Sequence, residues 1–148
     1  MTHYTTDEVR KHTLAQANAY LTHLQSGDWE AYAALWAEDA TFEFPYAPDG
    51  QPRVLHGKDA ILTHMTSMMR SLVVDDVPVL EVVPAADPEM VVAELEMQMR
   101  VVSTGTLYHQ RYVTIFTFEG GLLRTYREYS NPLVFLRSFA PPEAEPRA

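Results

Sequence analysis

Apolar residues recur every three or four positions in the first half of the chain, a spacing that places them on one face of a helix. The first helix is expected over residues 5–26, because a threonine opens it and Glu8 stands three residues later, as in a capping box. A second helix should follow from its cap at Asp28 through Trp36. A third should occupy residues 57–72. Helices therefore dominate the first half.

Alternation of apolar and polar residues takes over in the second half and predicts strands. A short strand precedes a proline-rich loop at 45–53, and longer strands follow it. The expected strands are residues 41–44, 73–83, 90–102, 107–118 and the segment after Gly121. A short helix is expected at 133–139. Helices first and long antiparallel strands later favour an α+β fold over a parallel sheet.

The composition fits a single globular domain. The chain has 148 residues, of which 47% are hydrophobic and 21% charged, so it can bury a core. We expect residues 1–140 to form this domain and residues 141–148 to form a disordered tail. The net charge of −9 would repel phosphate groups, which argues against nucleic acid and anionic membranes as partners.

Residue patterns typical of membrane insertion, secretion and cofactor binding are missing from the sequence. No apolar run approaches a membrane span, the N-terminus lacks a secretory pattern, and there is no cysteine, which together fit a cytoplasmic protein. The six histidines show no metal-binding spacing, and no phosphate-binding loop or dinucleotide fingerprint occurs. We therefore predict no metal and no cofactor, and a small molecule as the partner.

The final strand carries the acidic residue with the clearest chemical potential, Glu128. Strict alternation places it on one face with Arg124, Tyr126 and Ser130. If that face lines a closed pocket, burial should raise the pKa of the Glu128 carboxyl toward neutrality, which suits an acid–base catalyst. If the face is exposed to water, Glu128 is only an ion-pair partner for Arg124 or Arg127.

The hairpin before this strand decides which neighbours Glu128 has. A strict two-residue turn at Gly120 and Gly121 would pair Glu128 with Val113. A three-residue loop with a bulge would instead place Glu128 on the face of Thr114. The sequence is compatible with both registers.

Several segments resemble a known superfamily. Residues 20–29, which contain Gly-Asp, and residues 34–42, which end in Ala-Thr-Phe, resemble the opening of nuclear transport factor 2-like proteins, which include ketosteroid isomerase and SnoaL-like polyketide cyclases. Residues 112–135, with Arg-Glu-Tyr-Ser-Asn-Pro at 127–132, are most similar to phenazine-biosynthesis A/B proteins. The resemblance implies a cone-shaped α+β barrel with N-terminal helices packed on a strongly curved mixed sheet, a pocket at the open end, and a homodimer.

The resemblance also implies roles for three side chains. In phenazine A/B proteins a glutamate and a histidine act as acid–base groups, and these correspond to Glu128 and His64. Ketosteroid isomerase has an oxyanion-donating tyrosine at the position of Tyr20. His64 shares an apolar helical stripe with Met68, and Tyr20 shares one with Leu24, so each could instead be an ordinary core residue.

Two related chemistries do not fit the sequence. The catalytic aspartate of ketosteroid isomerase falls at Phe44, and its protonated aspartate falls near Val113 or Thr114, none of which is acidic. Limonene epoxide hydrolase needs aspartates on the late strands, whereas no aspartate follows Asp87 in this chain.

Seven further residues are predicted to contact a substrate, most of them bulky side chains that would shape a pocket. They are Trp36, Phe44, Tyr46, Arg53, Met68, Tyr112 and Tyr126. Tyr46 and Arg53 flank the proline-rich loop. Arg53 could pair with a substrate carboxylate or remain a solvated loop residue.

The leading hypothesis is a cofactor-independent enzyme in specialised metabolism that cyclises, condenses or isomerises an apolar, carbonyl-bearing small molecule. Glu128 would be the general acid/base, His64 a second proton carrier and Tyr20 a hydrogen-bond donor. One alternative is a non-catalytic protein that binds a small molecule in the same pocket. Another is a scaffold whose cavity is filled by its own side chains.

Overall fold

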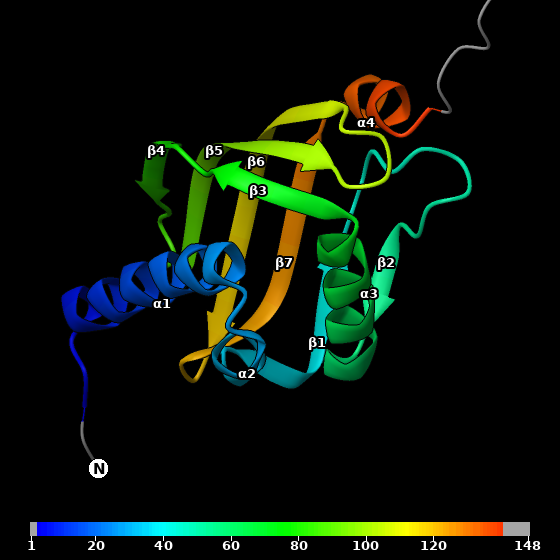
Figure 1. Cartoon of the computed structure of the whole chain (residues 1–148). Coiled ribbons are helices and arrows are strands. Elements are labelled where there is room, and N and C mark those ends of the chain that lie inside the picture. The colour runs from blue at the N-terminus through cyan, green and yellow to red at the C-terminus, as the bar shows by residue number, and fades with distance from the viewer. Residues whose placement is uncertain (1–2, 141–148) are drawn as a thin grey trace, which may run out of the picture.

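A computed structural model describes residues 3–140 of the chain. Helices α1 (Thr6–Ser26) and α2 (Trp29–Ala34) lie across one face of a curved sheet, α3 (Lys58–Arg70) stands at its flank, and α4 (Pro132–Ser138) lies at one end (Figure 1). The expected disordered tail at 141–148 lies outside the described residues.

The ends of the first two helices follow from their capping residues. The hydroxyl of Thr5 accepts the backbone N–H of Glu8, and the Glu8 carboxylate accepts the backbone N–H of Thr5, so the expected capping box is present. Gly27 ends α1 in the left-handed conformation, with φ of 72°. The second helix is shorter than predicted. The chain leaves α2 before Trp36, which begins strand β1 instead.

Seven strands form one mixed sheet. They are β1 (Trp36–Glu43), β2 (Val54–His56), β3 (Leu72–Asp76), β4 (Val79–Pro84), β5 (Met90–Val101), β6 (Leu107–Glu119) and β7 (Leu122–Ser130). The order is β2-β1-β7-β6-β5-β3, with β4 also paired to β5. The pairing of β1 with β7 is parallel, and the other pairings are antiparallel. The α+β fold with helices on a curved mixed sheet is confirmed.

Two strand predictions need correction. The segment 73–83 is not one strand, because it divides at Val77 and Pro78 into β3 and β4. Proline has no backbone N–H to donate to a ladder, so a break there is expected. A further strand, β2, was not predicted: residues 54–56, directly after the proline-rich loop, pair with β1.

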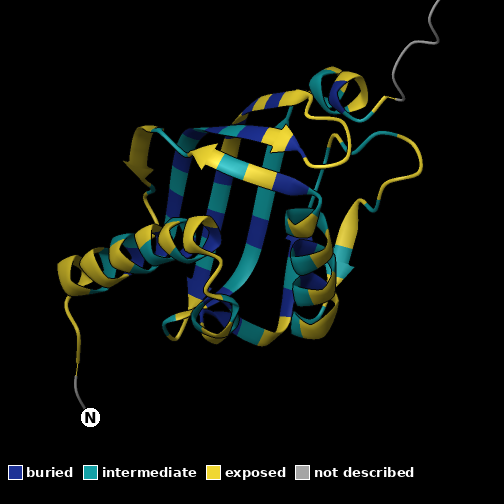
Figure 2. Cartoon of the chain, in the orientation of Figure 1, coloured by how far each residue is buried: buried dark blue, intermediate teal, exposed yellow. Residues whose placement is uncertain are grey.

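The inner face of the sheet carries the core. Along β5 and β6 buried and more exposed residues alternate strictly, as the banded strands in Figure 2 show. Aromatic rings from α1, β1, β6 and β7 pack against one another in this core. Tyr126 is central to them, with ring centroids 4.8 Å from Tyr20, 4.6 Å from Phe42 and 4.9 Å from Phe116.

A bulge in β7 sets the position of Glu128. Residues 119 and 122 pair across a two-residue Gly120-Gly121 turn, and Phe118 pairs with Leu123. The register then shifts by one residue at Arg124, so that Thr114 pairs with Glu128. The bulged register is thus the one adopted, although the extra residue lies in the strand and not in the loop. The predicted shared face of Arg124 and Glu128 is wrong, because Leu123 is fully buried and Arg124 turns outward to Asp39.

Candidate active site in the cone

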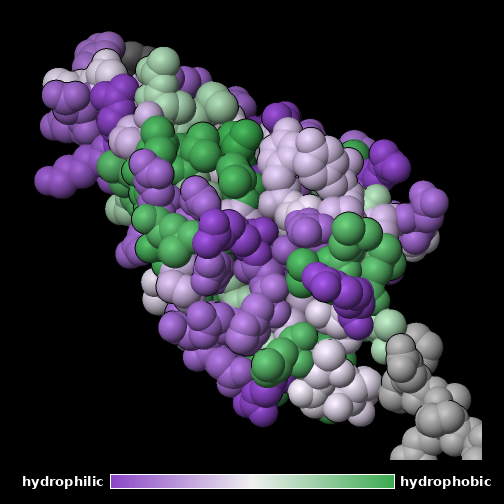
Figure 3. Space-filling model, turned by 90° about the horizontal axis from the view of Figure 1, so that it is seen from above, coloured by the Kyte–Doolittle hydropathy of each residue, from purple (hydrophilic) through white to green (hydrophobic). Residues whose placement is uncertain are grey.

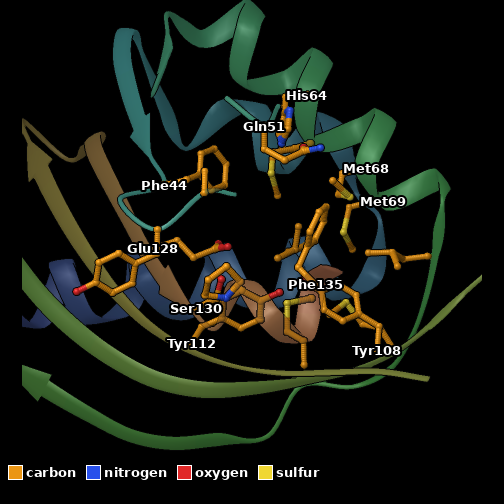
Figure 4. Close-up of a pocket in the computed structure, with 18 of the residues that line it drawn as sticks. Phe44, Gln51, His64, Met68, Met69, Tyr108, Tyr112, Glu128, Ser130 and Phe135 are labelled. Atoms are coloured by element: carbon orange, nitrogen blue, oxygen red, sulfur yellow. The ribbon is translucent and has the colours of Figure 1, made fainter. Parts of the chain in front are cut away.

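A pocket lies between α1, α3, α4 and the concave face of the sheet, with a cavity volume of about 120 Å³. Its walls are mainly apolar. Five methionines contribute, Met65, Met68 and Met69 from the α3 side and Met97 and Met99 from β5. Figure 4 shows side chains of α3 on one wall and Tyr112, Glu128 and Ser130 of the sheet on the opposite wall. A cavity of this kind suits a small apolar ligand held by a few polar groups.

Glu128 points into this pocket and has no ion-pair partner among the described residues. The two arginines that could have paired with it bind elsewhere. Arg124 contacts Asp39, and Arg127 donates from Nε to Glu43 at 2.9 Å. The only protein hydrogen bond to the Glu128 carboxylate within residues 3–140 is a long one, 3.5 Å from the Tyr126 hydroxyl to Oε2. The alternative of a solvated ion pair is therefore not what the structure adopts.

The surroundings of Glu128 change its acidity. Its side chain is half-buried, and the carboxyl group lies among the mainly apolar side chains that line the pocket. Loss of water raises the pKa of Glu128 from 4.5 to about 7, and the weak Tyr126 hydrogen bond only partly opposes this. A carboxyl group with a pKa near 7 exists in both forms at neutral pH, so it can accept and donate a proton.

His64 occupies the opposite wall. It projects from α3 and is half-buried. The centroid of its ring lies 5.5 Å from the centroid of the Phe44 ring. Burial lowers the pKa of His64, so the neutral imidazole prevails at pH 7. No hydrogen bond or ion pair joins His64 to Glu128 in the described part of the chain, and Figure 4 shows the two facing each other across the cavity. A ligand between them could contact both.

Phenol groups supply further hydrogen-bond donors. Tyr112 and Tyr126 line the pocket, and burial raises the pKa of each hydroxyl well above 10.0. Both therefore remain protonated and can donate to an oxygen that becomes negative.

The Tyr126→Phe variant should raise the pKa of Glu128 further, above about 7, because it removes the one hydrogen bond that stabilises the carboxylate. The ring and its packing are kept. A titration of the Glu128 carboxyl in both proteins checks this direction, and an unchanged or lower midpoint in Tyr126→Phe would contradict it.

The structure brings together seven of the ten side chains predicted from sequence. Phe44, Tyr46, His64, Met68, Tyr112, Tyr126 and Glu128 line the pocket. Three do not reach it. Trp36 is buried in the aromatic core, and Arg53 is exposed at the surface. Tyr20 stacks on the ring of Tyr126, and its hydroxyl accepts a hydrogen bond of 3.1 Å from the hydroxyl of Tyr32.

The sequence prediction omitted four polar or aromatic lining residues. They are Gln51, Tyr108, Ser130 and Phe135. Alternation had already placed Ser130 on the face of Glu128, although it was not named as a substrate contact. Tyr108 could have been found in the same way, because it lies an even number of residues from Tyr112 on the same strand. Gln51 and Phe135 reach the pocket through the path of a loop and a short helix, which no residue period indicates.

The described residues contain no cluster of metal-binding side chains. Nowhere in residues 3–140 do three or more histidine, cysteine, aspartate or glutamate side chains gather as metal ligands would. Within the same range, no helix combines the length and apolar character that crossing a membrane requires.

The fold and the pocket define a class of small α+β cones that enclose an apolar cavity beneath helices. The SnoaL-like domain family matches residues 17–126, and the chain belongs to that family. Its relatives include the protein YesE of Bacillus subtilis (strain 168), 32% identical over 81% of this chain and 82% of its own length. Another is a PhzA/B-like protein, PA3332 of Pseudomonas aeruginosa, 29% identical over 82% of this chain and 85% of its own.

Solved structures agree with this assignment. A Bacillus subtilis protein provisionally assigned as an isomerase superposes with a TM-score of 0.80 at 31% identity, covering 92% of this chain and 96% of its own. Rv0760c from Mycobacterium tuberculosis, solved in complex with estradiol-17β-hemisuccinate, gives a TM-score of 0.71 at 21% identity, covering 81% of this chain and 94% of its own. The latter likeness shows the fold alone.

Proposed function

We propose that this chain is a cofactor-independent enzyme that moves a proton on a small, apolar, carbonyl-bearing molecule. The supporting observation is the position of Glu128, a carboxyl group in a mainly apolar pocket with a pKa of about 7 and no counter-ion among the described residues. Isomerisation, condensation and cyclisation of a carbonyl compound can each begin with such a proton transfer. The isomerase assignment of a B. subtilis relative is in line with this proposal.

The first step would be removal of a proton from the carbon next to the carbonyl group. The Glu128 carboxylate takes this proton, and the electron pair of the broken C–H bond moves into the enolate, whose oxygen becomes negative. The hydroxyls of Tyr112 and Tyr126 are the donors available to that oxygen. Tyr20 can act only indirectly, through its packing against Tyr126.

The proton would then return at a carbon or oxygen atom of the same molecule. Glu128, now neutral, can donate it, which completes an isomerisation. His64 faces the ligand from the other wall, and its neutral imidazole can accept or donate a second proton. A condensation or cyclisation would use the same enolate as the carbon nucleophile.

Exchange of carbon-bound hydrogen tests this function without knowledge of the natural substrate. Acetophenone, a one-ring ketone, should exchange its methyl protons in D₂O faster with the protein than in buffer, as followed by NMR. Because the base form of Glu128 is needed, the rate should rise with pH to a plateau above about 7. Binding of acetophenone with no exchange at any pH would contradict catalysis.

A carrier or sensor that binds a small molecule without reaction is the second candidate function. The five methionines favour it, because flexible thioethers adapt to ligands of different shape. Rv0760c of M. tuberculosis, which has a similar fold, was solved in complex with the small molecule estradiol-17β-hemisuccinate. Binding without pH-dependent exchange is the result that a carrier would give.

We further propose that the chain acts as a homodimer in the cytoplasm. Apolar side chains remain exposed on β4, namely Val79, Leu80, Val82 and Val83, and Figure 3 shows apolar areas among polar ones on the surface. A second copy would remove such surface from water. Light scattering should then give twice the chain mass of 16.8 kDa.

A further inference from the structure

The inner chamber beside Glu128 is small for the ligands that cones of this shape can hold. Its volume is about 120 Å³. In another protein an apolar cavity of about 150 Å³ binds benzene. The chamber therefore has room for one ring or a short branched group, whereas drug-sized ligands need roughly 300–1,000 Å³.

An open groove continues from this chamber between α3 and α4, with a volume of about 610 Å³. Four side chains border both spaces and form a neck between them: Gln51, His64, Met68 and Phe135. Figure 4 shows Met68 and Phe135 approaching from the two helices. Met68 has a flexible side chain, so the neck can adjust to a chain that passes through it.

The groove and the chamber share one electrostatic character. Among the described residues, no aspartate, lysine or arginine lines the chamber or the groove. Glu128 and His64 are the only acidic or basic side chains of that kind in the lining that these residues form. The groove offers the hydroxyls of Ser67 and Ser71 beside the apolar side chains of Leu136 and Phe139. An anionic ligand would meet no cation here in a protein of net charge −9. Arg53 is exposed and lines neither the chamber nor the groove.

We infer that the site is bipartite and that its ligand is an uncharged, elongated molecule. A compact carbonyl-bearing head occupies the chamber next to Glu128, and a chain extends through the neck into the groove between α3 and α4. This assignment rests on the proposed function for the identity of the head. The groove itself is argued from its continuity with the chamber and from the chamber's small volume.

Straight-chain alkyl phenyl ketones from acetophenone to decanophenone test the arrangement. Burial of each added methylene is worth about 0.8 kcal/mol, so affinity should rise about threefold to fourfold per carbon until the groove is filled. Calorimetric titration gives the Kd of each ketone. A Kd that does not fall from acetophenone to octanophenone would overturn the proposal, as would failure of every ketone to bind.

The variant Ser67→Trp isolates the groove from the chamber. Ser67 is exposed and borders only the groove, so a tryptophan there should raise the Kd of octanophenone by about tenfold or more and leave that of acetophenone within about twofold. Thr63→Trp, one helical turn earlier and bordering neither space, is the matched control. Equal losses for both ketones in Ser67→Trp would overturn the groove assignment.

The two proposals fail in different measurements. If the groove assignment is wrong, chain length stops affecting Kd while Glu128-dependent exchange of acetophenone continues. If the proposed function is wrong, exchange is absent, but the dependence of Kd on chain length and its loss in Ser67→Trp remain.

Discussion

Replacing Glu128 with glutamine should lower the rate of acetophenone exchange by about two to four orders of magnitude, the usual contribution of a general base. The amide has nearly the same shape as the carboxyl group but cannot take up a proton at neutral pH. The rise in rate centred at a pH of about 7 should disappear with it, because Glu128 is the group that titrates there. NMR rate measurements across the pH range give both results.

Glu94→Gln is the matched control for this change. Glu94 lies on the outer face of β5, opposite the face that lines the pocket, and contacts Arg111 at 3.7 Å. Its replacement removes one negative charge from the same protein and should leave the exchange rate and its pH dependence unaltered. Exchange in Glu128→Gln within about threefold of the wild-type rate would eliminate Glu128 as the base.

The same Glu128→Gln variant should be more stable than the wild-type protein above neutral pH. The pKa of Glu128 is about 7 in the folded chain, against 4.5 as its ordinary value. Between these values the folded state binds more protons than the unfolded state, so wild-type stability falls as pH rises through this window. At about 1.4 kcal/mol per pKa unit the loss approaches at most about 3 kcal/mol, and glutamine does not incur it.

Urea denaturation of both proteins at about pH 4 and about pH 8 measures this difference. The stability gap between variant and wild type should widen by up to about 3 kcal/mol toward the higher pH, while other ionisable groups cancel because both proteins share them. A gap that is independent of pH would mean that Glu128 titrates alike in the folded and unfolded chain. Active-site groups commonly have such a cost in stability.

Strand periodicity was enough to predict much of the site. It placed Tyr126 and Glu128 on one face of the final strand. Helical spacing on α3 placed His64 and Met68 together. These residues line the pocket because α3 and the part of β7 after the bulge each keep a regular period.

The bulge at Arg124 is where periodicity failed. A one-residue insertion moves every residue on one side of it to the opposite face of the sheet. Strict alternation through Arg124 therefore placed Leu123 on the face opposite to Glu128, whereas both point inward. The sequence left two registers open because a two-residue turn and a later bulge fit the same glycines. Pairing with both β1 and β6 fixes the choice, and such long-range contacts are not encoded in local spacing.

The predictions for the three residues that do not reach the pocket were wrong for a related reason. Tyr20 and Trp36 are aromatic residues on buried faces, and periodicity does not separate the layer that contacts a cavity from the layer behind it. Arg53 was placed by its nearness to a loop, and the loop turns its side chain to solvent. How deep a residue lies depends on tertiary packing.

Direct titration of the Glu128 carboxyl tests the central claim, that an enclosed apolar pocket holds this group near neutrality. Carbon-13 NMR of protein labelled at glutamate side chains, with Glu128→Gln used to assign the signal, reports its midpoint. A midpoint of about 7 is expected. A midpoint close to 4.5, the ordinary value for glutamate, would show a well-hydrated carboxylate and contradict the account.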